Sequence, residues 1–231
     1  MTTTTQHDLV VLDMAGTTVA DDGLVEQAFT AAATRLGEDP ATMIDHVRAT
    51  MGESKISVFR HLFGGDEQRA RQANLAFEAA YAELVAAGRI APVPGAAETI
   101  ATLREQGRTV VLTTGFARPT QDAILDALGW RDLVPLTLCP ADAGGRGRPF
   151  PDMVLAAFLR TGAVDDVRRI VVAGDTSYDM LSGVRSGAGI VAGVLTGAHD
   201  EAALAAHGAT RVLPSVAGLP ALIGEHEERT A

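Results

Sequence analysis

The chain has 231 residues and a formal net charge of −10, which argues against nucleic acid or an anionic membrane surface as a partner. Hydrophobic residues make up 47% of it and charged residues 21%, as in ordinary globular proteins, and the single cysteine, Cys139, excludes a disulfide framework. The N-terminal segment has no signal-peptide pattern and the apolar runs fall short of the roughly 20 residues of a membrane helix, so we expect a cytoplasmic protein.

The first predicted strand is the apolar run DLVVL at residues 8–12, which is rich in β-branched side chains and precedes a Gly-Thr-Thr turn. Four similar runs follow it, at residues 108–115, 168–175, 188–197 and 210–215. The runs are short and are followed by helical segments, which is the pattern of βα units. The sequence therefore predicts an α/β fold with a doubly wound parallel sheet, a Rossmann-like core.

Residues 20–90 interrupt this alternation. Four stretches with helical periodicity fill the interval, at residues 25–37, 41–52, 55–65 and 66–88. The sequence APVPG at residues 91–95 marks the return to the sheet. We therefore predict an all-α cap at residues 20–90, inserted into a core made of residues 1–19 and 91–231. The cap helices have apolar faces, so a homodimer through the cap is a further expectation.

Carboxylates stand at the ends of two predicted strands, where open parallel sheets bind their ligands. Asp13 ends the first strand, and the backbone N–H groups of the turn at residues 16–18 can hold an anion beside it. Asp175 and Asp179, in GDTSYD, follow a later strand. Carboxylates from neighbouring strand ends make a hard oxygen site suited to Mg²⁺. The predicted partners are thus a metal ion and a small-molecule anion.

A hydroxyl and a guanidinium complete the pattern. Thr114, in the TTG at residues 113–115, offers a donor, and Arg148, in GRGRPFP, offers a planar fork for phosphoryl oxygens. Taken alone, a strand-end aspartate is often a helix N-cap, TTG is often a turn, and GRPFP is often a solvated loop. Their joint occurrence in this order favours a site that stabilises a transferring phosphoryl group, with Asp13 as the nucleophile.

Lys55 is the only lysine among the 19 basic residues of the chain. Exposed basic positions usually accept either lysine or arginine, so the composition indicates a preference for arginine wherever arginine serves. A lysine retained in such a background points to chemistry that arginine cannot perform. The guanidinium stays protonated and is a poor nucleophile, whereas an amine can lose its proton and attack a carbonyl group.

With these motifs in this order, the sequence resembles the haloacid dehalogenase-like hydrolases across nearly the whole chain. DMAGTT, TTG, GRP and GDTSYD resemble the four motifs of that superfamily, and the helical insert resembles its cap. Most of its phosphatases carry an aspartate as general acid where this chain has Ala15. With alanine there, and with Met51, Gly52 and Lys55 at the spacing of the cap segment that holds the catalytic lysine, the sequence resembles phosphonoacetaldehyde hydrolase.

The resemblance implies a role for each matching residue. Asp13 would attack phosphorus and form an aspartyl-phosphate, and Lys55 would form a Schiff base with the aldehyde. The residues implied to hold Mg²⁺ are Asp13, Ala15 through its carbonyl, and Asp175, supported by Thr17, Thr176 and Asp179. The residues implied to contact the substrate are Thr114 and Arg148, together with Ala15, Gly16, Met51, Gly52 and Gly115.

Ala15 and Lys55 explain each other chemically. A carbon leaving group on phosphorus is poor unless its developing carbanion is delocalised, and a Schiff base turns that group into an enamine. The amine must be neutral to attack, so we expect Lys55 to be desolvated, with a lowered pKa. The predicted function is Mg²⁺-dependent hydrolysis of the C–P bond of phosphonoacetaldehyde or a closely related carbonyl phosphonate.

Two other functions stay open: a phosphate monoesterase of the same superfamily acting on a small phosphorylated metabolite, and a non-catalytic sensing or assembly module. The sequence also departs from the resembled family. Val58 stands where a histidine is usual and Phe116 where a tyrosine is usual, and the cysteine that follows the first motif is missing. Glu53 and Ser54 replace apolar residues, and a Glu53 paired with Lys55 would hold the amine charged.

Overall fold

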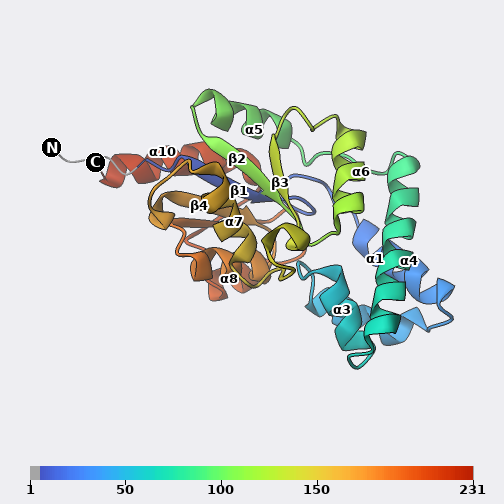
Figure 1. Cartoon of the computed structure of the whole chain (residues 1–231). Coiled ribbons are helices and arrows are strands. Elements are labelled where there is room, and N and C mark those ends of the chain that lie inside the picture. The colour runs from blue at the N-terminus through green and yellow to red at the C-terminus, as the bar shows by residue number, and fades with distance from the viewer. Residues whose placement is uncertain (1–5, 231) are drawn as a thin grey trace.

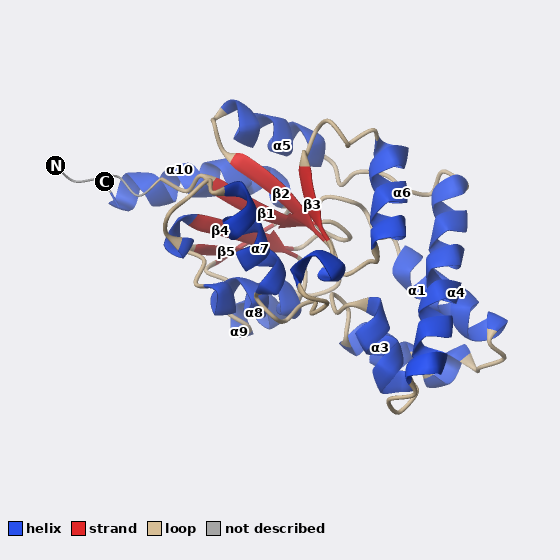
Figure 2. Cartoon of the chain, in the orientation of Figure 1, coloured by secondary structure: helices blue, strands red, loops and turns tan. Residues whose placement is uncertain are grey.

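The computed structural model describes residues 6–230 and contains a six-stranded parallel sheet with the strand order β3-β2-β1-β4-β5-β6 (Figure 1 and Figure 2). The strands are β1 (Leu9–Asp13), β2 (Thr109–Thr113), β3 (Leu136–Leu138), β4 (Ile170–Gly174), β5 (Ile190–Val194) and β6 (Arg211–Leu213). With β1 in the middle and crossovers to both sides of it, this is a doubly wound, Rossmann-like sheet. The predicted fold class is confirmed.

The edge strand β3 was not expected from the sequence. It has only three residues, Leu-Thr-Leu, and prolines lie immediately before it and two residues after it. So short a segment has no periodicity to recognise, and it forms a strand because β2 beside it offers a free edge. Among residues 6–230, no helix combines the length and the apolar character that a membrane crossing requires.

Helices cover both faces of the sheet. The helices of the core are α5 (Ala96–Glu105), α6 (Arg118–Leu128), α7 (Asp152–Thr161), α8 (Ser177–Ser186), α9 (Glu201–Ala206) and α10 (Leu219–Thr230). Val10 and Leu12 of β1 pack in one apolar cluster with α5 and α10, and Leu9 and Val11 pack in another with α7. Burial of both faces explains why the strands are apolar runs without alternation.

The strand register brings the functional motifs to one edge of the sheet. Asp13 pairs with Thr113 of β2, and Leu12 pairs with Ala173 of β4. Because the strands are parallel, their carboxyl ends lie together, and so do the segments that follow them. The side chains predicted to bind the phosphoryl group therefore start from neighbouring positions.

Besides α5, four helices lie between β1 and β2, within residues 20–90, where the sequence predicts four helical stretches. They are α1 (Leu24–Arg35), α2 (Ile44–Ala49), α3 (Lys55–Leu62) and α4 (Glu67–Ala86), with a 3-10 turn at Pro40–Thr42. An aromatic group joins α1, α3 and α4: the Phe29 ring centroid lies 4.8 Å from that of Phe59 and 4.7 Å from that of Phe77. Figure 1 shows α1, α3 and α4 grouped at the end of the molecule beyond β3.

Two chain segments connect these helices to the sheet and are hydrogen-bonded to each other. The Ala20 amide donates to the Ala91 carbonyl at 2.9 Å, and the Val93 amide donates to the Thr18 carbonyl at 3.0 Å. One apolar cluster nevertheless runs from the sheet through to the cap helices, and α6 packs against α4. The division of the chain at residues 20 and 91 stays a prediction.

Candidate active site

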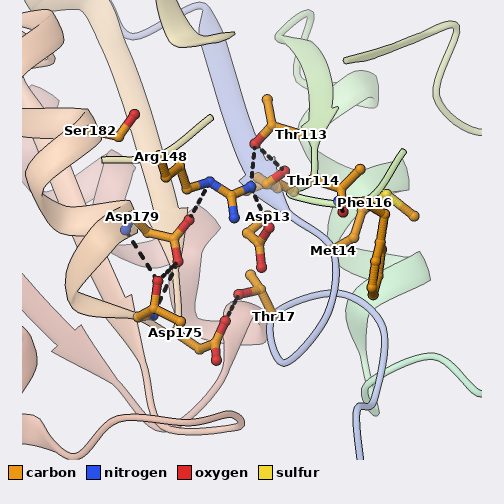
Figure 3. A network of polar contacts seen from close by, with 12 residues as sticks. Asp13, Met14, Thr17, Thr113, Thr114, Phe116, Arg148, Asp175, Asp179 and Ser182 are labelled. Atoms are coloured by element: carbon orange, nitrogen blue, oxygen red, sulfur yellow. Dashed lines mark hydrogen bonds and ion pairs between the residues drawn. The ribbon is translucent and has the colours of Figure 1, made fainter. Parts of the chain in front are cut away.

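Asp13, at the end of β1, is held by a buried arginine (Figure 3). The Arg148 guanidinium donates from Nη2 to Oδ1 of Asp13 at 2.5 Å and to Oγ1 of Thr113 at 3.1 Å. Its Nε lies 2.9 Å from Oδ1 of Asp179 in α8. Arg148 is 5% exposed, so the solvated-loop alternative fails for it. The N-cap alternative fails for Asp13, because the next helix, α1, begins after Gly23.

Three buried carboxylates form the centre of the site. One oxygen of each of Asp13, Asp175 and Asp179 lies within 4.8 Å of the others. Burial raises the pKa of Asp13 well above its usual range, although Arg148 opposes the change. Burial, and then the charge of Asp179, raise the pKa of Asp175 to about 7. The protein itself therefore supplies too little positive charge to balance this group.

A divalent cation with oxygen ligands fits these residues. Asp13 and Asp175 offer carboxylate oxygens, and a cation would relieve the repulsion that raises their pKa values. The third predicted ligand is the carbonyl oxygen of Ala15, and within the described part of the chain no hydrogen bond reaches it. Ala15 lines one small cavity together with Asp13 and Asp175. The arrangement thus supports a metal site at the predicted place.

Neighbouring groups fix the orientation of Asp175 and Asp179. Oδ1 of Asp175 accepts from the Thr17 hydroxyl at 3.1 Å, and Oδ2 accepts from the Ala198 amide at 2.8 Å. Asp179 and Thr176 form a capping box at the start of α8, in which the Thr176 amide donates to Oδ2 of Asp179 at 3.1 Å. The residues predicted to support the metal ligands therefore do contact them or each other.

Gly16 allows the turn after β1 to approach Asp175. Its φ is +85°, and a Cβ there would lie 2.4 Å from Oδ2 of Asp175. The amide of Gly16 donates to the Val19 carbonyl at 2.7 Å, so this amide is not available to a phosphoryl group. Gly16 was expected to contact the substrate. In the structure its lack of a side chain leaves room for the carboxylate of Asp175.

Thr114, directly after β2, lies beside Phe116 (Figure 3) and lines the same cavity as Asp13 and Arg148. Its hydroxyl oxygen accepts from the Phe116 amide at 3.2 Å, so the hydroxyl hydrogen remains for a ligand. The sequence pattern predicts no role for Thr113, whereas in the structure its hydroxyl oxygen accepts a hydrogen bond from Arg148.

Lys55 is the first residue of α3 and is 7% exposed. Its Nζ lies over the Phe116 ring, 5.4 Å from the centroid. Burial lowers the pKa of Lys55 to about 8, although the carboxylates of Asp21 and Asp13 oppose the change. Nζ makes no hydrogen bond or ion pair within residues 6–230. The predicted desolvation of this amine is therefore present in the structure.

A small cavity of about 40 Å³ joins the two halves of the site. The predicted residues that line it are Asp13, Ala15, Met51, Gly52, Lys55, Thr114, Gly115, Arg148, Asp175 and Thr176. Gly16, Thr17 and Asp179, which were also predicted, do not line it. A volume of roughly 10–15 Å³ holds one water, so the space suits a ligand of a few heavy atoms.

The cap closes on the core through a seam without side chains, formed by Gly52, Gly115 and Gly147. A Cβ on Gly52 would lie 2.4 Å from Oγ1 of Thr176, and one on Gly115 would lie 2.8 Å from the Glu53 carbonyl oxygen. A Cβ on Gly147 would lie 2.8 Å from Cβ of Ser54. These approaches bring the segment before α3, and with it Lys55, against the strand ends.

Glu53 and Val58 do not take part in the cavity. Burial raises the pKa of Glu53, and the charges that lower it are His61 first and Lys55 second. Glu53 is therefore not the main partner of the amine. Val58 is 1% exposed and belongs to the apolar core of the cap.

Three groups of the site escaped the sequence reasoning. Asp21 and Phe116 line the cavity, and Phe116 had been noted only as a departure. Asp21 carries a sequence signal, an acidic residue soon after the first motif, that was given no role. Ala198 contributes a backbone amide, for which a side-chain pattern holds no signal.

Comparisons with known proteins show the family and the fold. The model of a family described as haloacid dehalogenase-like hydrolase matches residues 7–187. A solved structure of a phosphonoacetaldehyde hydrolase-like protein from Oleispira antarctica superposes with a TM-score of 0.83 at 24% identity, covering 97% of this chain and 94% of that one. A likeness at this identity supports the fold.

Curated relatives carry two kinds of name. The chain is 30% identical over 196 residues to a protein of Dickeya dadantii named "Probable phosphatase IndB", covering 83% of this chain and 82% of that protein. It is 30% identical over 165 residues to a phosphonoacetaldehyde hydrolase of Parabacteroides distasonis, covering 68% of this chain. The chain spans 60% of the length of that second relative.

Proposed function

Because the chain belongs to the haloacid dehalogenase-like hydrolases, we propose that it hydrolyses the C–P bond of phosphonoacetaldehyde or a closely related carbonyl phosphonate, with Mg²⁺ as its cofactor. The observation that carries the proposal is the position of Lys55. The only lysine of the chain is buried and lines the same small cavity as Asp13, and its Nζ makes no hydrogen bond or ion pair within the described residues.

The phosphoryl half of the reaction would use the core residues. A carboxylate oxygen of Asp13 attacks phosphorus, and the P–C bond breaks as the new P–O bond forms. Arg148 and Thr114 hold the phosphoryl oxygens in place. Mg²⁺, held by Asp13, Asp175 and the Ala15 carbonyl, would offset the negative charge that gathers there. Water then hydrolyses the aspartyl-phosphate and releases phosphate.

The carbonyl half would use Lys55. Its neutral amine adds to the aldehyde carbon, and loss of water gives a protonated imine. The electron pair of the breaking P–C bond enters this imine and forms an enamine, which is protonated at carbon and hydrolysed to the aldehyde product. With a pKa of about 8, about a tenth of the amine is neutral near pH 7.

A phosphate monoesterase acting on a small phosphorylated metabolite is the second candidate. The relative named as a phosphatase favours it, since the match spans more of that protein than of the phosphonoacetaldehyde hydrolase. Ala15 weighs against it, because the resembled phosphatases protonate their alkoxide leaving group with an aspartate at this position. A purely non-catalytic module is disfavoured because Asp13, Asp175 and Arg148 all converge on the site.

Borohydride trapping separates the two candidates. The protein is incubated with phosphonoacetaldehyde and borohydride, and its peptides are mapped by mass spectrometry. We expect an adduct at Lys55, and none in Lys55→Arg. A missing adduct in the wild type, together with good turnover of phosphate monoesters, would overturn the proposal.

Asp13→Asn tests the other half of the reaction. This variant should still form the Lys55 adduct but release no phosphate. Asp8→Asn, at the opposite end of the same strand region and paired with Arg169, is the matched control and should keep both activities.

Sedimentation of the purified chain tests the predicted homodimer.

A further inference from the structure

Asp21 is a carboxylate that faces the carbonyl half of the site. It lies in the segment between the turn after β1 and helix α1, and it lines the same cavity as Lys55. Its Oδ1 accepts from the Val25 amide at 3.0 Å, and its backbone carbonyl accepts from the Leu24 amide at 2.7 Å. These two bonds fix the carboxylate at the start of α1, while no hydrogen bond within the described residues occupies Oδ2.

Asp21 and Lys55 interact across the cavity without a direct ion pair. Among the charges that act on Lys55, that of Asp21 raises the pKa most, against the larger opposing effect of burial. Burial raises the pKa of Asp21, while the Val25 amide and then the Lys55 charge lower it; Glu26 and Asp22 act in the direction of burial. The acid and the amine therefore have pKa values closer together than in water, which favours proton exchange between them.

Two aromatic side chains lie beside this pair. Phe116 lies beside the amine, and its ring centroid is 4.7 Å from that of Tyr81 on α4. The Tyr81 hydroxyl is buried without a hydrogen-bond partner in the described chain, and burial and the Asp21 charge both raise its pKa. Among residues 6–230, the cavity is lined by three carboxylates, and Asp21 is the one on the carbonyl side, since Asp13 and Asp175 belong to the phosphoryl side.

We propose that Asp21 is the catalytic acid and base of the Schiff-base step at Lys55. This inference rests on the proposed function. The amine forms a C–N bond with the aldehyde carbon, and the carbonyl π electrons move to oxygen, which takes a proton from the Asp21 carboxyl. The carboxylate then removes a proton from the nitrogen and returns it to the hydroxyl group. The C–O bond breaks, and water and a protonated imine result.

Among the described residues, no other carboxylate is positioned to act as the acid and base of this step. Asp13 must remain free to attack phosphorus, and Asp175 is bound by Thr17 and Ala198. The pKa of Glu53 is lowered more by the charge of His61 than by that of Lys55, and Glu53 does not line the cavity. Asp21 and Lys55 line the same cavity without forming an ion pair within the described residues.

The test compares Asp21→Asn with Asp22→Asn, its exposed neighbour. The rate at which borohydride traps phosphonoacetaldehyde on Lys55 is measured for both variants and the wild type. We expect a loss of about 100-fold in Asp21→Asn, at the lower end of general acid–base effects, and less than twofold in Asp22→Asn. The affinity for inorganic phosphate, measured by calorimetry in the presence of Mg²⁺, should be unchanged in both.

Each remaining result contradicts a different statement. Trapping in Asp21→Asn at the wild-type rate would overturn the role of Asp21. Equal losses of trapping and of phosphate affinity would show that Asp21 only maintains the structure, which also overturns it. Failure of the wild type to be trapped, with phosphate affinity intact, would overturn the proposed function itself and the Asp21 role with it.

Discussion

The two halves of the site differ in how their polar groups are satisfied. On the core side, Arg148 alone contacts Asp13, Thr113 and Asp179, and each carboxylate has a partner. On the cap side, Nζ of Lys55 and the Tyr81 hydroxyl have no hydrogen-bond partner within residues 6–230. The core half is rigidly organised for charge, whereas the cap half keeps an amine desolvated. Preorganisation serves phosphoryl transfer, and the lack of partners serves nucleophilic attack.

Removing the central arginine should break the core half with the largest effect. In Arg148→Ala the buried carboxylates of Asp13 and Asp179 lose their counter-charge, so we expect the free energy of unfolding to fall by about 3–5 kcal/mol. Phosphate release should fall by at least about 100-fold. Urea denaturation and a phosphate assay measure the two effects. In the control Arg146→Ala, which removes an exposed partner of Asp152, stability should change by less than about 1 kcal/mol.

The pH dependence of trapping should sharpen the contrast. An amine attacks only when neutral, and the neutral fraction of Lys55 grows with pH until the pKa of about 8. In Asp21→Asn, where no carboxyl group has to be protonated, we therefore expect the initial trapping rate to rise about tenfold per pH unit and to level off at or below that value. A rate that keeps rising to about pH 10, as for an exposed lysine, would show that the cap does not desolvate the amine.

A methyl group at the seam should weaken cap closure. Gly52→Ala places a Cβ 2.4 Å from Oγ1 of Thr176, so we expect kcat/KM to fall by about tenfold. Gly64→Ala is the matched control, because Gly64 also has a positive φ, +60°, but nothing lies within 4 Å of its added Cβ. Equal kinetic losses in the two variants would mean that backbone strain, and not the collision, is responsible.

The smallest expected effect concerns Tyr81. Replacing it with phenylalanine removes a buried hydroxyl that has no partner in the described chain, so Tyr81→Phe should leave stability unchanged or raise it by up to about 1 kcal/mol. Thermal and urea unfolding measure the change. A clear destabilisation would show that the hydroxyl has a bound partner, such as an ordered water.

The sequence predicted the core half well because its groups follow apolar strands in order. Parallel strands bring their carboxyl ends together, so Asp13, Thr114 and Asp175 had to lie near one another. Arg148 was predicted in the site from its residue type and from the order of the motifs, because its loop has no periodicity that could place it. Strand β3 was missed because three residues carry no pattern, and its pairing depends on the neighbouring edge.

The cap half was harder to predict, because its contacts join segments that no local pattern links. Lys55 was noticed through composition, while its contact with Phe116 and its interaction with Asp21 depend on how the cap closes. The sequence also leaves open whether Glu53 pairs with Lys55. In the structure the charge of His61 lowers the pKa of Glu53 more than the charge of Lys55 does.

The seam of Gly52, Gly115 and Gly147 has a practical consequence for trapping conformations. Each position tolerates hydrogen where a methyl group would collide with the facing segment. Alanine at any of them would add the same methyl group at a different point of the seam and hold the facing segments apart there. The three single variants, and their combinations, would then provide a graded series of open forms whose reactive side chains are all intact.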